Sequence, residues 1–398
     1  MVLTIKLVTS VSFRAAGKQA IIQQRFIDSL DEAPRHTTIM NWVLKIGCYE
    51  LTKPKPKADD WVIILDHSIQ IGTEKVFVVL GIKESSIQFD RPLQYKDLTP
   101  LIITSRKKWN GEDVAEHLRC LEDEIGKIKY AVGDYGSNIK KGLRLRKITH
   151  IHDVTHWMAL LVEKLYKKDT QYELFCLKLS EMRNKLYQSE IAHIIPPKQR
   201  NKSFYQNIKT ISDWAIKSLQ LADNQSEKTK TFKKEKENLV WLRDFRDLIN
   251  ELNRINQTIC EIEKVIKTNG LSNQTIKTCN AILNQSKLDS SEKGKSVKQK
   301  TLNYMIEILQ LIPNAKSLIC TSDILESAFG KYKNYVSSNQ MACVTNLILC
   351  IAAFTSSLTE EAIVIALEKT KMKDVKEWTK KNIGDSVLKK RTVMLSAA

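Results

Sequence analysis

Two aspartates each follow an apolar run of the kind that forms a buried β-strand. Asp66 follows residues 61–65, and Asp134 follows residues 130–132 and Gly133. Hard divalent cations prefer carboxylate oxygens, and two carboxylates at one end of a sheet can share such ions. Paired ions support phosphoryl transfer, because one activates the attacking oxygen and the other stabilises the leaving oxygen. An acid after a strand is also an ordinary start of a loop.

A third acid is expected, because a pair of carboxylates rarely satisfies a hard cation. Glu326 is the best candidate, since apolar residues recur around it at positions 325, 328, 329 and 332, the spacing of one helical face. Glu326 and Lys333 then lie on the rim of that face, two turns apart and on the same side. Such a helix would present a carboxylate to metal ions and a cation to DNA. The alternative is a solvated glutamate on an amphipathic helix.

The strand order decides whether Asp66 and Asp134 meet. Strands are predicted at residues 61–65, 76–80, 101–104, 130–132 and 149–152. Helices are predicted behind Asn110 and from a capping Ser137 through Leu143. The order is therefore three strands, helix, strand, helix, strand, and in such a sheet the strands of Asp66 and Asp134 lie side by side.

After Trp157 the sequence predicts long helices, including residues 172–194 and 239–268. Residues 223–237 and 286–300 are rich in lysine and are interpreted as solvated loops or helix ends, with contact to a phosphate backbone as the alternative. A new helix is expected near Asp323. Residues 341–354 are expected to form a buried helix, too short to span a bilayer.

The N-terminal region predicts two helices, at residues 19–30 and 39–49, with a break at 31–34 and a cap from Thr37 or Thr38. This outline is typical of a helix-turn-helix, in which His36, Thr38 and Lys45 would meet DNA, although such helical pairs are common in any α protein. The prolines of residues 51–57 indicate a linker.

Charge and composition bear on the partner and the compartment. The 398 residues carry 63 Lys and Arg against 45 Asp and Glu, a formal charge of +18, which favours a polyanion such as nucleic acid. A basic protein without such a partner is the alternative. The eight cysteines include no Cys-x-x-Cys pair, so we expect a reducing cytosol. No signal peptide and no membrane contact are expected.

Two further groups have both a chemical and a structural interpretation. His150, His152 and His156 beside Asp153 could form a zinc site, but His156 lies beyond the strand that would carry the other two histidines. Trp241 could stack on an unpaired base, as could Trp157. Both tryptophans lie in amphipathic stretches, where core packing is the better interpretation.

The pattern of strands and acids resembles the ribonuclease-H-like fold of DDE transposases and retroviral integrases. Local strings also resemble one bacterial transposase group: LDHSIQIG at 65–72, GDYGSN at 133–138, DVTH at 153–156 and ILES at 324–327. The string DVTH matches the Cys-or-Asp, two residues, His signature of Mutator-like and hAT-like transposases. Glu326 with Lys333 matches half of another bacterial group's signature, but Ile319 and Ser322 replace its Tyr and Arg.

This resemblance covers residues 18 to about 391 and implies a DDE transposase with an α/β ribonuclease-H-like core. Asp66, Asp134 and Glu326 would be the catalytic residues and the ligands of two Mg²⁺ ions, which Mn²⁺ can replace. Asp153, His156 and Lys333 would support them. The implied reaction is cleavage at transposon ends followed by strand transfer into target DNA, by a homodimer or higher oligomer in the bacterial cytoplasm and nucleoid.

The expected domains are a helix-turn-helix at 1–52, a linker at 53–60 and a first core segment at 61–156. An all-helical insertion follows at 157–315, and 316–398 holds the helix of Glu326 and a helical C-terminal tail. The insertion accounts for the long separation between Asp134 and Glu326. Two alternatives stay open, a structure-specific nuclease of the same fold and a non-catalytic DNA-binding protein derived from a transposase.

Overall fold

The computed structural model describes residues 1–9, 11–26, 32–71, 74–200, 204–224, 230–313, 315–336, 344–384 and 387–396. These residues form two compact units. Unit 1 comprises Met1–Asp153 and Thr321–Ala398, and unit 2 comprises Val154–Cys320. Unit 2 is thus inserted in the sequence of unit 1, and each unit is described by itself.

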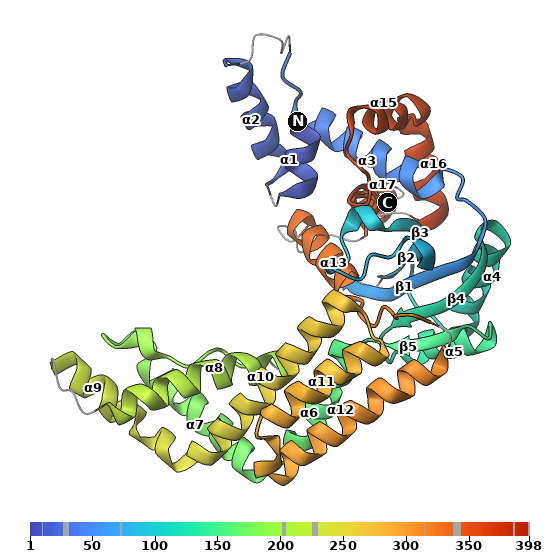
Figure 1. Ribbon diagram of the computed structural model, residues 1–398. Helices are drawn as coiled ribbons and strands as arrows, with labels where there is room; N and C mark the ends of the chain where they lie inside the picture. The colour runs from blue at the N-terminus through green and yellow to red at the C-terminus, as the bar shows by residue number, and fades with distance from the viewer. Residues whose placement is uncertain are drawn as a thin grey trace. The chain divides into compact units, whose positions relative to one another are not determined.

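Unit 1 is built on a mixed five-stranded sheet with the order β3-β2-β1-β4-β5 (Figure 1). The strands are β1 Ala58–Ile71, β2 Glu74–Lys83, β3 Thr99–Arg106, β4 Gly126–Gly133 and β5 Thr149–His152. Strand β2 runs antiparallel to its neighbours β1 and β3, whereas β4 runs parallel to β1 and β5 parallel to β4. The predicted order of strands and intervening helices is confirmed, and β1 lies beside β4.

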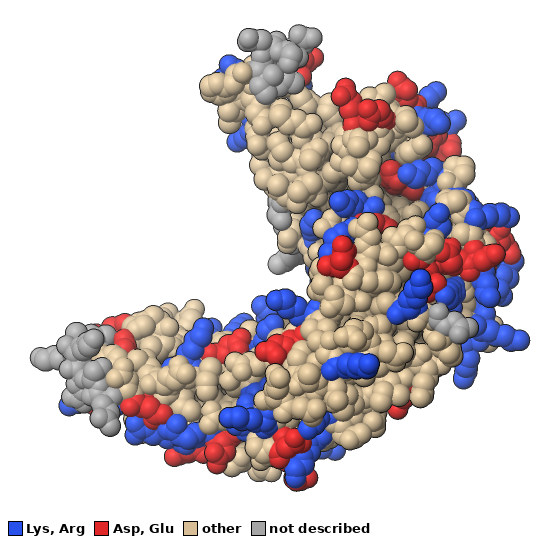
Figure 2. All heavy atoms as spheres, viewed as in Figure 1, with Lys and Arg blue, Asp and Glu red and all other residues tan. Residues whose placement is uncertain are grey.

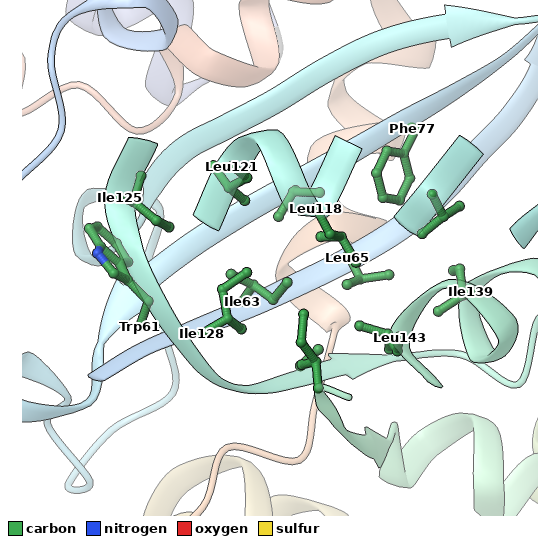
Figure 3. Close-up of a cluster of buried hydrophobic side chains, with 14 residues drawn as sticks. Trp61, Ile63, Leu65, Phe77, Leu118, Leu121, Ile125, Ile128, Ile139 and Leu143 are labelled. Carbon is green, nitrogen blue, oxygen red and sulfur yellow. The ribbon is translucent and has the colours of Figure 1, made fainter. Parts of the chain in front are cut away.

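One face of this sheet is covered by α4 Gly111–Ile125 and α5 Ser137–Leu145. Alternate residues of β1, such as Ile63 and Leu65, point into a core that also contains Leu118 of α4 and Leu143 of α5 (Figure 3). Side chains alternate along a strand, so Ile64 and Asp66, which follow Ile63 and Leu65, point to the other face of the sheet.

The remaining helices of unit 1 come from both ends of the chain. They are α1 Val2–Val8, α2 Phe13–Gln24, α3 His36–Thr52, α13 Asp323–Val336, α14 Cys350–Ala353, α15 Glu360–Lys369, α16 Met372–Asn382 and α17 Val387–Ser396, with the 3-10 turns η1 Glu84–Ser86, η2 Tyr95–Asp97 and η6 Asn346–Leu349. Helices α3, α14 and α16 contact β3, and α13 contacts β1. The helix that carries Glu326 is therefore packed against the strand that carries Asp66.

Unit 2 is helical apart from a single bridge between Leu271 and Leu318 in its described residues. Its elements are α6 Val154–Tyr166, α7 Thr170–Leu186, η3 Ala192–Ile194, α8 Phe204–Asp223, α9 Lys230–Leu239, η4 Val240–Phe245, α10 Arg246–Asn269, α11 Asn273–Gln285, η5 Leu288–Ser290 and α12 Glu292–Leu311. The long helix α10 contacts α6, α8, α11 and α12. It forms the centre of this unit.

Several predicted boundaries differ from the structure. Helix α1 was not predicted, and α2 lies at Phe13–Gln24 where 19–30 was expected; residues 27–30 lie outside the described part of the chain. The N-cap of α3 is Arg35, so Thr37 and Thr38 lie inside the helix and do not cap it. Likewise Gly136, and not Ser137, is the N-cap of α5.

The polar stretches also differ, because lysine-rich sequence is compatible with an exposed helix. Helix α9 occupies much of 223–237, and α12 begins at Glu292 inside 286–300. The apolar run 341–354 is buried at Val344 and from Ile348 to Phe354, as expected, but forms only the short η6 and α14. Residues 341–343 lie outside the described residues.

Two general findings concern the chain as a whole. No helix among the described residues has the length and apolar character needed to cross a membrane. Every cysteine that the structure describes is a free thiol, and Cys343 lies outside that set.

Candidate active site

Asp66 and Asp134 lie at the same level of two neighbouring parallel strands. Ile64 of β1 pairs with Val132 of β4, and each aspartate comes two residues later. Neighbouring strands are about 4.8 Å apart, so this register brings the two carboxylates to one place on the sheet. Asp66 lies within β1, opposite Val78 of β2, because the strand continues to Ile71; it does not end the strand as predicted.

Asp134 directly follows the last residue of β4 and closes a tight turn into α5. Its Oδ1 accepts a hydrogen bond of 2.8 Å from the Gly136 amide. A Cβ added at position 136 would lie 2.9 Å from that oxygen, so glycine lets the turn pass close to the carboxylate. The other carboxylate oxygen is not engaged by this turn.

Neutral imidazoles surround Asp134. Burial lowers the pKa of both His67 and His152 to about 4, and the nearby Asp134 carboxylate opposes this only in part. The His67 ring packs against Phe77, with ring centroids 5.0 Å apart, and the His152 ring stacks on Tyr135 at 3.9 Å. These histidines carry no charge at neutral pH, so the negative charge of Asp134 is available to a cation.

Asp153 connects the end of the sheet to the start of α13. Its side chain is fully buried, and its Oδ2 accepts hydrogen bonds from the Ser322 amide at 2.5 Å and the Ser322 hydroxyl at 2.9 Å. The Asp153 amide donates to the carbonyl of Gly133, the neighbour of Asp134. One residue thus couples the position of Asp134 to the segment that begins the helix of Glu326.

Helix α13 has the sidedness that the sequence predicts. Leu325, Ala328, Phe329 and Tyr332 are buried, whereas Glu326 and Lys333 are exposed. The apolar face therefore holds the helix, and Glu326 lies on its exposed side.

A second face of α13, at positions 327, 331 and 335, is held by aromatic rings and cations. Tyr95 donates a hydrogen bond of 2.8 Å from its hydroxyl to Ser327. The Lys331 ammonium lies 4.6 Å from the Tyr95 ring centroid, and the Lys6 ammonium lies 3.3 Å from that of Tyr335. We call this set of contacts the α13 ladder. It was not predicted, because it joins residues more than 200 positions apart.

The ladder ends on a buried lysine. The Lys6 ammonium also lies 4.3 Å from the Phe13 ring centroid and donates to the carbonyl of Val11 at 2.6 Å. Burial lowers the pKa of Lys6 to about 8, and the neighbouring Cys350 opposes this shift. Lys331 is partly buried, and burial lowers its pKa as well.

The donor set suits a hard divalent cation. Asp66 and Asp134 are carboxylates in register, and Glu326 lies on a helix packed against β1. Within the described residues, no three or more His, Cys, Asp or Glu side chains form a group that could hold a metal ion. This applies to the three acids and equally to the zinc alternative at His150 and His152.

The structure places α3 differently from the predicted DNA-reading helix. Ile39, Val43 and Ile46 are buried, and a Cβ at Gly47 would lie 2.1 Å from the carbonyl oxygen of Leu349. Lys45 donates from its ammonium to the Leu367 carbonyl at 2.7 Å. Helix α3 is thus enclosed by α14, α15 and α16.

Two of the residues predicted to bind DNA in this region remain accessible. His36, the first residue of α3, is exposed, and Thr38 is partly exposed. The sequence prediction did not distinguish these two positions from Lys45. A signal was present, because apolar residues occur on several sides of α3 and such a helix has no long face free for DNA.

Three residues that the sequence analysis singled out, His156, Trp157 and Trp241, belong to unit 2. His156 lies in the first turn of α6 and is half-buried. Trp241, in η4, packs 5.9 Å from the Phe175 ring and 5.8 Å from the Phe245 ring, measured between centroids. Trp241 is nevertheless partly exposed. Trp157 stacks on Tyr304 at 4.5 Å, which is core packing.

Comparisons with known proteins give limited information. No protein-family model matches the chain, and no curated protein matches it in a search by sequence. Among solved structures, the chain is similar to the Drosophila P element transposase strand transfer complex, with 12% identity, a TM-score of 0.43, and coverage of 91% of this chain and 92% of that one. Values this low do not assign a fold family or an activity.

Proposed function

We propose that this chain is a DDE-type transposase with a ribonuclease-H-like core, which cuts and joins DNA strands with the help of bound magnesium. The observation that carries the proposal is the register of β1 and β4, which sets Asp66 and Asp134 side by side on adjacent parallel strands. The packing of α13 against β1 supports Glu326 as the third acid.

The proposed roles follow from these positions. Asp66 and Asp134 would hold the cations, and Glu326 would complete the ligand set as α13 adjusts toward the sheet. Bound magnesium would neutralise charge on the scissile phosphate and activate water, and then a 3′-hydroxyl, as the nucleophile. The Asp153 contacts to Ser322 would keep the start of α13 in place during this adjustment. No side chain forms a covalent intermediate in this scheme.

The test measures nicking and joining of DNA that carries the ends flanking the coding region, with magnesium and with EDTA. Asp66→Asn and Asp134→Asn each keep the side-chain shape and remove a charged ligand, so both should lose cleavage while retaining DNA binding. Asp59→Asn is the matched control, because Asp59 is an exposed acid at the other end of β1.

Each outcome has a defined meaning. Equal nicking by Asp66→Asn and wild type would overturn the proposal. Metal-dependent cleavage of the ends without joining to a target would replace the transposase with the structure-specific nuclease.

A further inference from the structure

A stretch of the chain beside Asp134 carries positive charge without any acid. From Tyr135 to His152 the sequence contains three lysines and two arginines and no Asp or Glu. This stretch comprises α5 and β5, directly after the candidate metal ligand. Because β4 and β5 are parallel, α5 leads from the Asp134 end of the sheet back to the start of β5, so the positive charge begins beside Asp134 and extends along the helix away from it.

Two of the five cations are neutralised by α4. Lys141 pairs with Glu112, with N and O 2.5 Å apart, and Arg146 pairs with Glu122 at 2.8 Å. The other three, Lys140, Arg144 and Lys147, are exposed, and none forms an ion pair with a described acidic residue. We call these three residues the α5 cation cluster.

Packing fixes the rotation of α5 about its axis and therefore the direction in which its cations point. Ile139 and Leu143 are buried in the sheet core, and a Cβ at Gly142 would lie 2.5 Å from Cγ1 of Val114 on α4. This close approach fixes the rotation of α5, so Lys140 and Arg144, four residues apart, stay on the same outward side. Figure 2 shows Lys and Arg side chains gathered over the region of α4 and α5, among the acids of α4.

One member of the cluster, Lys140, lies close enough to β5 for its charge to act on the histidines of that strand. Burial is the main cause of the lowered pKa of His150 and of His152; the Lys140 charge adds to it at both residues, and the Asp134 carboxylate opposes it at His152. Helix α5 also contacts β5 directly, which places Lys140 beside that strand. Lys140, near the start of α5, is therefore the member of the cluster beside the acid site, and Arg144 and Lys147 continue the positive charge along the helix away from it.

We propose that the α5 cation cluster binds the phosphate backbone of the nucleic-acid strand whose scissile bond lies at Asp66 and Asp134. This inference rests on the proposed function for the position of the bond. The contact is electrostatic and independent of base sequence, because flexible lysines and an exposed arginine meet the backbone and no base edge.

The test measures the affinity for a duplex of arbitrary sequence against salt concentration, in EDTA so that no cleavage occurs. The triple variant Lys140→Gln, Arg144→Gln, Lys147→Gly should bind more weakly, and the slope of log affinity against log salt should become shallower by about 2 to 3, since each phosphate contact contributes about 0.9. The control triple variant Lys373→Gln, Lys376→Gln, Lys380→Gln removes the same charge from α16 and should leave the slope nearly unchanged.

Lys147→Gly alone separates binding from folding. Lys147 has a φ of 58°, a conformation that glycine adopts without strain, so this variant should be at least as stable as wild type. It should still lose about one unit of salt slope.

The proposal is overturned if the α5 variant keeps the wild-type slope, or if both triple variants lose the same amount, which would indicate a general charge effect. A wild-type chain that binds in this way but never cleaves in magnesium would remove the proposed function and leave the binding surface. The two failures are therefore distinguishable.

Discussion

The strand-borne acids and the helix-borne acid are held in different ways. Asp66 and Asp134 owe their spacing to main-chain pairing between β1 and β4, which no single side chain determines. Glu326 owes its place mainly to side-chain contacts, namely the buried face of α13, the α13 ladder and the Asp153 carboxylate that accepts from Ser322. Strand pairing thus fixes the two strand acids relative to each other, whereas the place of the helix-borne acid depends on how α13 packs.

The largest effect should come from changing ligand length at the rigid and the adjustable positions. Asp134→Glu pushes a carboxylate one methylene into a fixed site, and we expect cleavage to fall on the order of a thousandfold, as for loss of a transition-state contact. Glu326→Asp should lose roughly ten- to a hundredfold, because α13 can approach, a loss typical of disturbed metal ligation. Single-turnover cleavage rates compare the two. Equal losses would mean that α13 is as rigid as the strands.

Asp153→Ala should come next. It leaves the Ser322 amide and hydroxyl without their buried acceptor, which costs about 1–3 kcal/mol of unfolding free energy. Cleavage should fall as well, because the start of α13 loses its attachment to the end of β5. Ser322→Ala is the matched variant and removes only the hydroxyl contact, so denaturant unfolding should show a smaller loss. An effect of Ser322→Ala equal to that of Asp153→Ala would contradict this assignment.

Lys6→Met should separate stability from activity. Replacing a buried ammonium with an apolar side chain of similar size is often neutral or stabilising, so unfolding at pH 7 should change little. Cleavage should slow several-fold, about the loss of an indirect positioning contact, because the ladder no longer holds Tyr335. A variant with wild-type cleavage would show that the ladder does not position Glu326.

The pH dependence of the same variant has a defined sign. The folded-state pKa of Lys6 is about 8 against an ordinary value of 10.5, so between these values the unfolded chain binds the proton and the folded chain does not. Wild-type stability attributable to Lys6 therefore rises with pH across this window, and Lys6→Met should lack that rise. Unfolding curves of both proteins at pH 7 and pH 9.5 measure the difference.

The smallest effect should come from Lys333→Ala. Lys333 is exposed and follows Glu326 by seven residues on the same side of α13, so it should contribute one phosphate contact and about one unit of salt slope. Lys331→Ala should leave the slope unchanged and lower stability, because Lys331 is committed to the Tyr95 and Phe354 rings. If Lys331→Ala lowered the salt slope and Lys333→Ala only lowered stability, Lys331 would be the phosphate contact and Lys333 the structural residue.

The sequence allowed the placement of the strand acids to be predicted for a physical reason. Apolar runs mark buried strands, so the positions of Asp66 and Asp134 beside strands could be predicted. That their strands are neighbours was expected if the sheet follows the predicted order, and the sheet confirms it. The sidedness of α13 could also be predicted, because the spacing of Leu325, Phe329 and Tyr332 is local.

Contacts between distant segments could not be predicted in this way. The enclosure of α3 depends on α14 to α16, which follow it by about three hundred residues, and Lys45 meets Leu367 across that interval. The α13 ladder likewise joins Lys6 to Tyr335. Hydrophobic periodicity indicates that a face is buried and does not indicate which partner covers it.

The hydrogen bonds between Asp153 and Ser322 also have a consequence for the order of events during synthesis. Asp153 leaves the ribosome before all of Val154–Cys320, and at about 5–20 residues per second its partner arrives on the order of ten seconds later. Until then the carboxylate has no serine donors and α13 does not exist, so the nascent sheet carries its two strand acids without the third. The chain therefore acquires its complete candidate site only after all of unit 2 has been synthesised and has had time to fold.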